Sequence, residues 1–235
     1  MNELKLAAAV DAVHAGDVAA LAQLLREDPW LATTRIGGRT LLHVATDWPG
    51  HFPNVRATIG ALVGAGADVN ARFEGAHSET PLHWAASSDD VEALDALLDA
   101  GADIAAPGAV IGGGTPLADA VAFAQWRAAR RLTERGSPVT LGQAAALGLL
   151  DRLEQICAAD PQPAPDEITA AFWAACRGGQ RRTAEYLLGR GADLNWIGWD
   201  NLAPIDAARR AGAHDLVQWL EDRGAKPAGE THHAR

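Results

Sequence analysis

The stretch from Thr80 to Gly101, TPLHWAASSDDVEALDALLDAG, decides the fold. Thr80 before Pro81 places a side-chain oxygen at a helix N-cap and a residue without an N–H at the first helical position, so a helix begins there. The paired leucines Leu97 and Leu98 belong to a second helix, and the glycine after them allows the left-handed conformation that ends it. The stretch therefore predicts two short helices joined by a turn.

The hexapeptide that opens this stretch recurs along the chain. Its variants are Thr40-Leu41-Leu42-His43-Val44-Ala45, Thr80-Pro81-Leu82-His83-Trp84-Ala85, Thr115-Pro116-Leu117-Ala118-Asp119-Ala120 and Ala203-Pro204-Ile205-Asp206-Ala207-Ala208. A second signature, Gly-Ala-Asp after a leucine-rich segment, recurs at 66–68, 101–103 and 191–193. A single helix pair is too small to bury its own apolar face, so the pairs must stack on one another.

These signatures closely resemble the ankyrin repeat family, whose hallmarks are a Thr-Pro-Leu-His-x-Ala start and a Gly-Ala-Asp-x-Asn finger about 33 residues apart. The resemblance covers nearly the whole chain and implies an all-α solenoid of about seven helix pairs with β-hairpin fingers. The expected repeats are near 3–36, 37–75, 76–110, 111–137, 138–163, 164–198 and 199–227, within a single domain over 1–227. Residues 228–235 lack an apolar pattern and are expected to form a mobile tail.

Departures from the repeat spacing indicate where this chain is specialised. The segment 47–54 is an insertion that we expect to form a loop at a helix turn. The fingers that contain 73–79 and 107–114 are longer than the family spacing and should reach further. After Gly136 and after Asp160 the chain passes almost directly into the next helix, so repeats four to six are expected to lack a normal finger.

Composition excludes several functional classes. The chain has 235 residues, a formal net charge of -10 and two cysteines, Cys157 and Cys176. The acidic balance argues against nucleic acid as a partner, and the cysteine count argues against a disulfide framework. With neither a secretion signal nor a membrane-spanning segment recognisable, the expected location is cytoplasmic. Abundant alanine with only Lys5 and Lys226 as lysines fits the codon usage of a GC-rich bacterial genome.

Tryptophan is unusually frequent, with eight Trp against four Phe and one Tyr. An indole carries an N–H donor and is an awkward core residue, so core filling alone does not explain this usage. The family resemblance implies a concave face lined by fingers and first helices, which would be rich in Trp here. The candidate groove residues are Trp48, His77, Trp84, Ser87, Phe123, Trp126, Trp173, Cys176, Trp196, Trp199 and Asp200.

Two functions compete for this groove. The family resemblance and the enrichment of Trp at binding hot spots favour recognition of a protein or peptide partner. The alternative is a small-molecule binder or enzyme, in which the long fingers and the 47–54 loop close over an aromatic box. Its acid–base candidates are Asp47 and His51, which would share one face if the helix persists, and Asp119, which would share a face with Phe123 and Trp126. The sequence shows no motif for a cofactor or a metal.

Other residues carry simpler interpretations. His43 and His83 occupy the histidine position of the hexapeptide, where the family's ring bridges neighbouring repeats by hydrogen bonds. Cys176 beside Arg177 could be a thiol of lowered pKa at the groove edge, or a small residue buried between helices.

Overall fold

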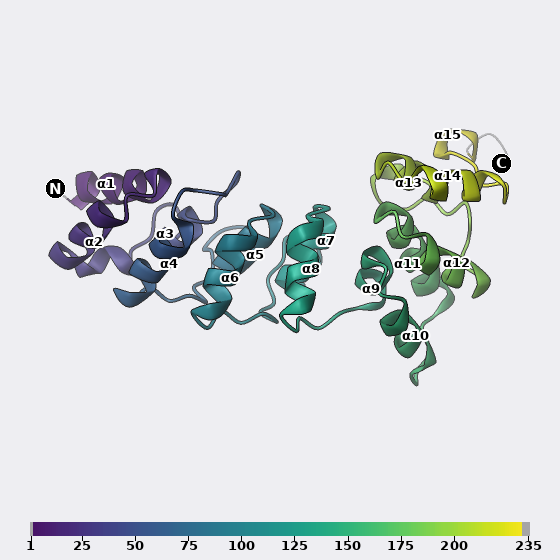
Figure 1. The fold of residues 1–235 in the computed structure, drawn as a ribbon, viewed down its shortest axis with the longest axis horizontal. Helices are drawn as coiled ribbons and strands as arrows, with labels where there is room; N and C mark the ends of the chain where they lie inside the picture. Colours follow the sequence, from purple (N-terminus) through teal and green to yellow (C-terminus); the bar gives the residue numbers. More distant parts are fainter. Residues whose placement is uncertain (1, 232–235) are drawn as a thin grey trace. The chain divides into compact units, whose positions relative to one another are not determined.

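The computed structural model describes residues 2–231 as short helices joined by turns and loops (Figure 1). The α-helices in that range are α1 (Asn2–Ala15), α2 (Val18–Glu27), α3 (Leu41–Val44), α4 (Val55–Gly64), α5 (Pro81–Ser87), α6 (Val91–Asp99), α7 (Pro116–Ala122), α8 (Trp126–Glu134), α9 (Leu141–Leu147), α10 (Leu150–Ala158), α11 (Pro165–Arg177), α12 (Arg181–Gly189), α13 (Pro204–Arg210), α14 (His214–Glu221) and α15 (Ala228–Thr231). Two 3-10 turns are η1 (Pro29–Ala32) and η2 (Trp199–Asn201). Of the predicted mobile tail, 228–231 form α15, and 232–235 lie outside the described residues.

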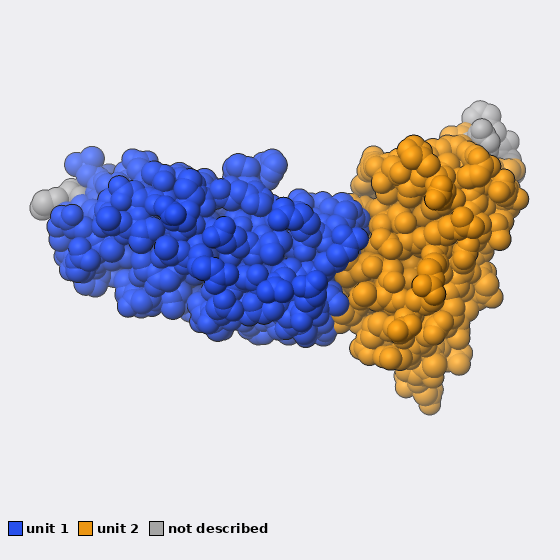
Figure 2. Space-filling view, in the orientation of Figure 1, with its two compact units in different colours: residues 1–138 blue, residues 139–235 orange. Residues whose placement is uncertain are grey.

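The chain divides into two compact units, residues 1–138 and 139–235 (Figure 2). The boundary falls between Pro138 and Val139, in the short segment between α8 and α9 where the sequence predicts a missing finger. A single domain over 1–227 stays a prediction.

Between residues 2 and 231, helices α1 to α14 form seven pairs, each with a first and a second helix. The hexapeptide sets the start of the first helix. The backbone N–H groups of Thr40 and Thr80 donate to the Nδ1 atoms of His43 and His83, at 3.2 Å and 3.1 Å. Each bond gives a partner to a backbone N–H that has no acceptor within the helix. The hexapeptide therefore acts as a capping box in which His replaces the usual Glu or Gln.

The second ring nitrogen of each histidine reaches the next repeat. Nε2 of His43 donates to the carbonyl oxygen of Glu79 at 3.2 Å, and Nε2 of His83 donates to that of Gly114 at 3.3 Å. Burial is the main cause that lowers the pKa of both rings to about 4, so both are neutral at pH 7. The bridging role implied by the family resemblance agrees with this geometry.

In unit 1, first helices pack on first helices and second helices on second helices, as Figure 1 shows for α5 to α8. The third hexapeptide position supplies the fully buried Leu42, Leu82 and Leu117. The leucine-rich signature of the second helices supplies the fully buried Leu62, Leu97 and Leu132. Each buried leucine stabilises the stack by about 1.5–3 kcal/mol relative to exposure. Unit 1 is therefore held together between repeats, as the sequence pattern predicts.

The fingers of unit 1 are hairpin turns rather than ladders of paired strands. Within residues 2–231 the one strand-type bridge joins Ile36 and Arg39. The next finger closes by the N–H of Phe73 donating to the carbonyl oxygen of Glu79 at 2.7 Å. Arg35 then links two consecutive fingers by donating to the carbonyl oxygen of Arg72 at 2.7 Å.

The next pair of fingers is linked in the same way. Arg72 donates to the carbonyl oxygen of Pro107. Asn70, the last residue of a Gly-Ala-Asp-x-Asn turn, accepts the N–H of Asp103 at 2.8 Å through its side-chain oxygen. The fingers of unit 1 are therefore held by their neighbours.

Unit 2 uses the same stacking, with α11 packed against α9 and α13. Its core includes the fully buried Phe172, and the glycine pair after α11 sets the next turn. Gly179 has a φ of 68°, whereas a Cβ on Gly178 would meet the carbonyl oxygen of Ala146 at 2.0 Å. Only glycine fits such a close approach, so this turn fixes the distance between α11 and α9.

Candidate functional site

Unit 1 carries an aromatic cluster where a finger meets the first helices. The ring of Trp84, on α5, lies with its centroid 5.5 Å from that of Phe73 in the preceding finger. It also lies 4.9 Å from the ring of His43, in an edge-on arrangement. Trp84 is half-buried, so one part of its indole packs in the unit and another part faces solvent. We call these three residues the unit-1 aromatic cluster.

Two buried carboxyl groups belong to the same side of unit 1. Asp119, in the first turn of α7, is fully buried, and its Oδ1 accepts the N–H of Val110 in the long finger at 3.1 Å. Its Oδ2 is buried without a hydrogen-bond partner. Burial first, and the charge of Glu79 second, raise the pKa of Asp119 to about 7. Glu79 is itself nearly buried, and burial raises its pKa while a hydrogen bond with Trp84 lowers it.

The inserted loop 47–54 packs, through His51, against the C-terminal end of α5, which is the end opposite to the finger before that helix. The backbone N–H of His51 donates to Asp90 Oδ2 at 2.6 Å, and Nε2 of His51 lies 3.1 Å from the carbonyl oxygen of Ser88. Ser88 and Asp90 follow the C-terminal end of α5, whereas the finger precedes its N-terminal end. The 7 residues of α5 separate these ends by about 10 Å. The loop is therefore not placed beside the finger 107–114.

The three acid–base candidates are not brought together. The predicted shared helix face of Asp47 and His51 is wrong, because α3 ends at Val44. Asp47 instead forms an ion pair with Arg39, with Nη1 and Oδ2 2.7 Å apart. His51 faces Asp90, with Nδ1 and Oδ1 3.9 Å apart, and Asp119 is enclosed under the finger 107–114.

The predicted shared face of Asp119, Phe123 and Trp126 is also wrong. Helix α7 ends at Ala122 and α8 begins at Trp126, with Ala124 in the left-handed region at a φ of 58°. Phe123 is thus exposed in the turn between the helices, and Trp126 is half-buried at the start of the second helix. Gln125 donates to the carbonyl oxygen of Ser87 at 2.9 Å, so Ser87 lies at this turn edge too.

Two further predicted residues of unit 1 are exposed. Trp48 is 75% exposed in the 47–54 loop, where its backbone N–H donates to Asp47 at 2.9 Å. His77 is exposed in the finger before α5 and acts electrostatically on Glu79. Trp48 therefore belongs to the turn edge, and His77 to the finger side with Trp84.

Unit 2 gathers three of the predicted tryptophans. Trp199 contacts the ring of Trp173 on α11 at a centroid distance of 5.0 Å and that of Trp196 at 5.7 Å, edge-on in both cases. Trp173 is almost fully buried, and its indole N–H donates to the carbonyl oxygen of Leu202 at 2.8 Å. Trp199 is 55% exposed, and Trp196 is half-buried. We call these three residues the unit-2 indole cluster.

Charged groups border the unit-2 indole cluster. Asp200, adjacent to Trp199, pairs with Arg210 on α13, with Oδ2 and Nη1 2.7 Å apart. Arg177, at the end of α11, is half-buried, and burial first lowers its pKa while Asp200 raises it and Arg210 lowers it. The arrangement combines indole faces with guanidinium groups, which are typical of protein-binding hot spots.

The groove role predicted for Cys176 is wrong. Its side chain is fully buried in the core of unit 2, and burial raises the pKa of the thiol far above its usual range. A buried, protonated thiol neither contacts a partner nor reacts readily. Of the two interpretations of Cys176, the small residue between helices is the one that the structure supports.

The sequence interpretation missed several contributors to these surfaces. Phe73 and Glu79 were placed only within a long finger, although Glu79 directly precedes the N-cap Thr80 and so had to lie at the base of α5. Arg177 was considered only as the neighbour of Cys176, and its proximity to Arg210 was not predicted. Helical spacing could identify their positions, whereas their proximity depends on how α11 and α13 stack.

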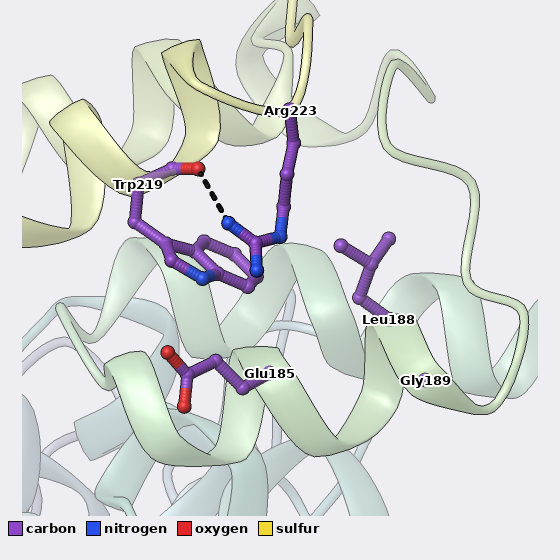
Figure 3. A pocket seen from close by; sticks show the side chains of 5 residues that line it. All are labelled: Glu185, Leu188, Gly189, Trp219 and Arg223. Carbon is purple, nitrogen blue, oxygen red and sulfur yellow. Dashed lines mark hydrogen bonds between the residues drawn. The ribbon is translucent and has the colours of Figure 1, made fainter.

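A solvent-open hollow of about 510 Å³ lies on unit 2 away from the indole cluster, between α12 and α14 (Figure 3). Its lining includes Glu185, Leu188 and Trp219. The guanidinium of Arg223 lies over the Trp219 ring, 4.2 Å from its centroid, and donates to the Trp219 carbonyl oxygen at 3.3 Å. Since its own arginine covers the indole, this hollow exposes little aromatic surface.

Two other kinds of feature are absent from the described residues. In the part of the chain from 2 to 231, no group of three or more His, Cys, Asp and Glu side chains is arranged to hold a metal ion. Over the same residues, none of the helices has the length and apolar character needed to cross a membrane.

Comparisons with known proteins point to one family. Residues 77–109 match the family model described as Ankyrin repeat. A curated relative, "Ankyrin repeat and KH domain-containing protein CBG24701" of Caenorhabditis briggsae, is 30% identical over 75% of this chain, and the chain covers only 7% of the length of that relative. The crystal structure of the human ASB11 ankyrin repeat domain is 19% identical, with a TM-score of 0.55, over 90% of this chain and 96% of that chain.

At 19% identity the match to a solved structure shows the fold alone, while the family model and the curated relative match the sequence. The capped hexapeptides, the His bridges between repeats and the stacked helix pairs are the physical features behind these matches. On this combined evidence, residues 77–109 are an ankyrin repeat, and the chain has the ankyrin-repeat fold.

Proposed function

We propose that this chain is a binding scaffold for a protein or peptide partner, which it contacts through its fingers and first helices. Ankyrin repeats generally serve as protein–protein interaction scaffolds, and the ankyrin-repeat fold supports this proposal. Function depends on the site rather than on the fold, so particular side chains must make the contact with the partner.

The exposure of Trp199 carries the proposal. More than half of this residue is exposed to solvent, although its ring is in edge-on contact with the rings of Trp173 and Trp196. A rigid indole that is already ordered loses little conformational entropy when a partner covers it. Burial of an exposed aromatic surface is also the main source of energy at binding hot spots. The unit-2 indole cluster is therefore the favoured contact surface.

The unit-1 aromatic cluster supports the same function independently. Trp84 packs on Phe73 and His43 but stays half-buried, and the exposed His77 belongs to the same finger as Phe73. The links from Arg35 to Arg72 and from Arg72 to Pro107 hold the fingers in place. A preorganised surface of this kind suits recognition of a folded or extended protein segment.

The alternative acid–base function has no comparable support. Its candidates Asp47, His51 and Asp119 are separated along the first helices, and Asp119 is enclosed. We further propose a cytoplasmic location, since both described cysteines are free and buried, and a partner other than nucleic acid, since the net charge is -10.

Selection from a random peptide display library against the full chain tests the proposed function. We expect enrichment of specific peptides, and Trp199→Ala should weaken their binding by about 30-fold, because a hot-spot residue contributes about 2 kcal/mol. Trp48→Ala is the matched control, since it removes another exposed indole at the turn edge of unit 1. If no peptide is enriched, or if the two variants weaken binding equally, the proposal fails.

A further inference from the structure

The finger between α12 and α13 ends in a tight turn that begins at Trp199. The N–H of Leu202 donates to the carbonyl oxygen of Trp199 at 3.2 Å. The two residues between them, Asp200 and Asn201, have φ values of 58° and 54°, the left-handed pair that a tight hairpin turn requires. Below the turn, the N–H of Gly198 donates to the carbonyl oxygen of Leu202 at 3.0 Å. The backbone of the finger therefore fixes the position of Trp199 before any partner binds.

The rings around this turn are fixed as well. A Cβ on Gly198 would lie 2.6 Å from the ring of Trp196 and 2.7 Å from Nε1 of Trp173, so the finger backbone is in close contact with both indoles. Trp196 and Trp199 meet at an angle of 82°, with their centroids 5.7 Å apart. Such an edge-on contact leaves the faces of one ring uncovered by the other. The unit-2 indole cluster thus offers ordered aromatic surface to a ligand.

The side chains of this cluster can donate hydrogen bonds but cannot accept them, because an indole is a donor only. Trp173 already uses its N–H on the carbonyl oxygen of Leu202, at 2.8 Å. Among residues 2–231, the indole N–H groups of Trp196 and Trp199 have no acceptor. A segment that covers the cluster therefore meets two donors that its carbonyl oxygens can satisfy.

The charges around the cluster are balanced. Three arginines and three carboxylates lie there, namely Arg177, Arg209, Arg210, Asp200, Asp206 and Glu221. Arg210 pairs with Asp200 at 2.7 Å, and Arg209 pairs with Glu221 at 2.9 Å. An uncharged segment is complementary to such a surface, because it brings no charge that would lose water without gaining a counter-ion.

We propose that the unit-2 indole cluster binds a proline-rich segment of a partner protein in the polyproline II conformation. This inference rests on the proposed function and specifies the chemistry of its partner. In that conformation the backbone makes no internal hydrogen bonds, so its carbonyl oxygens accept the indole N–H groups of Trp196 and Trp199. Proline rings pack on the exposed indole, as they do in aromatic-lined grooves.

Other backbone conformations match the cluster less well. A helix has already used most of its carbonyl oxygens internally. An extended segment without proline brings backbone N–H groups, which the indoles cannot accept. Proline lacks an N–H and therefore leaves no such donor unpaired.

The experiment determines the sequences of the enriched peptides and then measures their affinity for full-chain variants by fluorescence anisotropy. We expect proline-rich peptides, and their affinity should change by less than about twofold between about 50 mM and about 500 mM NaCl, because no charge selects them. Alanine in place of the prolines should weaken binding about tenfold, because the segment is then no longer preorganised.

A conservative variant tests the hydrogen bond itself. Trp199→Phe keeps an aromatic ring but lacks the N–H, so it should weaken binding about fivefold. Trp48→Phe is the matched control, since it makes the same change at an exposed indole of unit 1, and it should stay within about twofold. Far-UV circular dichroism verifies that each variant is folded.

Each other outcome overturns the inference. Enriched peptides without proline, or peptides whose affinity falls steeply with salt, would show a partner of different chemistry and leave the proposed function intact. Equal affinities for the wild type and Trp199→Phe would show that the indole N–H does not bind the segment. Peptides whose binding depends on Trp84 and not on Trp199 would remove this site from the proposed function. A dimer in sedimentation velocity that dissociates on Trp199→Ala would show that a second copy covers the indole. Failure to enrich any peptide would remove both proposals.

Discussion

The indole N–H of Trp173 donates a hydrogen bond of 2.8 Å to the carbonyl oxygen of Leu202, which ties helix α11 to the finger before α13. Trp173 is buried by this contact, while Trp199 on the same finger stays exposed beside it. The two neighbouring indoles thus have different roles. Trp173 supports the finger from the core, and Trp199 is the side chain that the finger exposes to solvent.

Replacement of each indole should separate these roles. Trp173→Phe keeps a ring in the core but leaves the Leu202 carbonyl without its donor, so it should destabilise the chain by about 1–3 kcal/mol. Trp199→Ala should cost about 1 kcal/mol or less, because more than half of the indole is already in water. Urea unfolding followed by circular dichroism measures both free energies of unfolding. Equal costs would mean that Trp199 is a packing residue.

Asp119 should make the stability of unit 1 fall as the pH rises. Its folded pKa, about 7, lies above the ordinary value of 3.8, so the folded state holds the proton more tightly. This contribution is complete below pH 3.8 and is lost as the pH rises to about 7. Asp119→Asn keeps the Oδ1 acceptor for Val110 without a charge. The Tm of the variant minus that of the wild type should therefore increase from pH 5 to pH 8, and a constant difference would contradict this account.

His43 and His83 should destabilise the fold in acid. Their folded pKa values, about 4, lie below the ordinary value of 6.5, so their contribution to stability is present above pH 6.5 and is lost as the pH falls toward 4. Glutamine can replace histidine in this cap, since the backbone N–H of Thr140 donates to Gln143 Oε1 at 2.9 Å in another repeat of the same chain. In the double variant His43→Gln, His83→Gln, the cap should remain while the acid transition in Tm becomes shallower. An unchanged acid profile would assign that transition to other groups.

Cys176 should be unreactive in the folded protein. The thiols of Cys157 and Cys176 are both buried, and burial raises the pKa of Cys176. Reaction with a disulfide reagent at pH 8 should be slow in buffer and fast in denaturant. A rapid native phase that disappears in Cys176→Ser would show instead that this thiol reaches the surface.

The sequence alone was enough to determine the repeat. Thr-Pro starts, buried leucines and turn glycines act within one repeat or between neighbours, and such local rules recur with the period of the chain. The capping by His43 and His83 follows from the same hexapeptide. The points at which the first helices end were not predictable in this way. Helix α3 ends at Val44, and Ala124 turns the chain after α7. These ends separate the candidate residues that helical spacing had placed on one face.

Tertiary structure decided which of the predicted residues can meet a partner. By residue type and repeat position, the sequence places three residues on the surface that stacking in fact buries, namely Trp173, Cys176 and Asp119. It also placed Arg177 near Arg210 and Asp200, although they come from α11, α13 and the finger between them. Sequence spacing within one helix specifies a face, but exposure and charge proximity depend on what the next repeat covers. For that reason the sequence determined the fold of this protein, and only the stacked structure determined which of its tryptophans and arginines face solvent together.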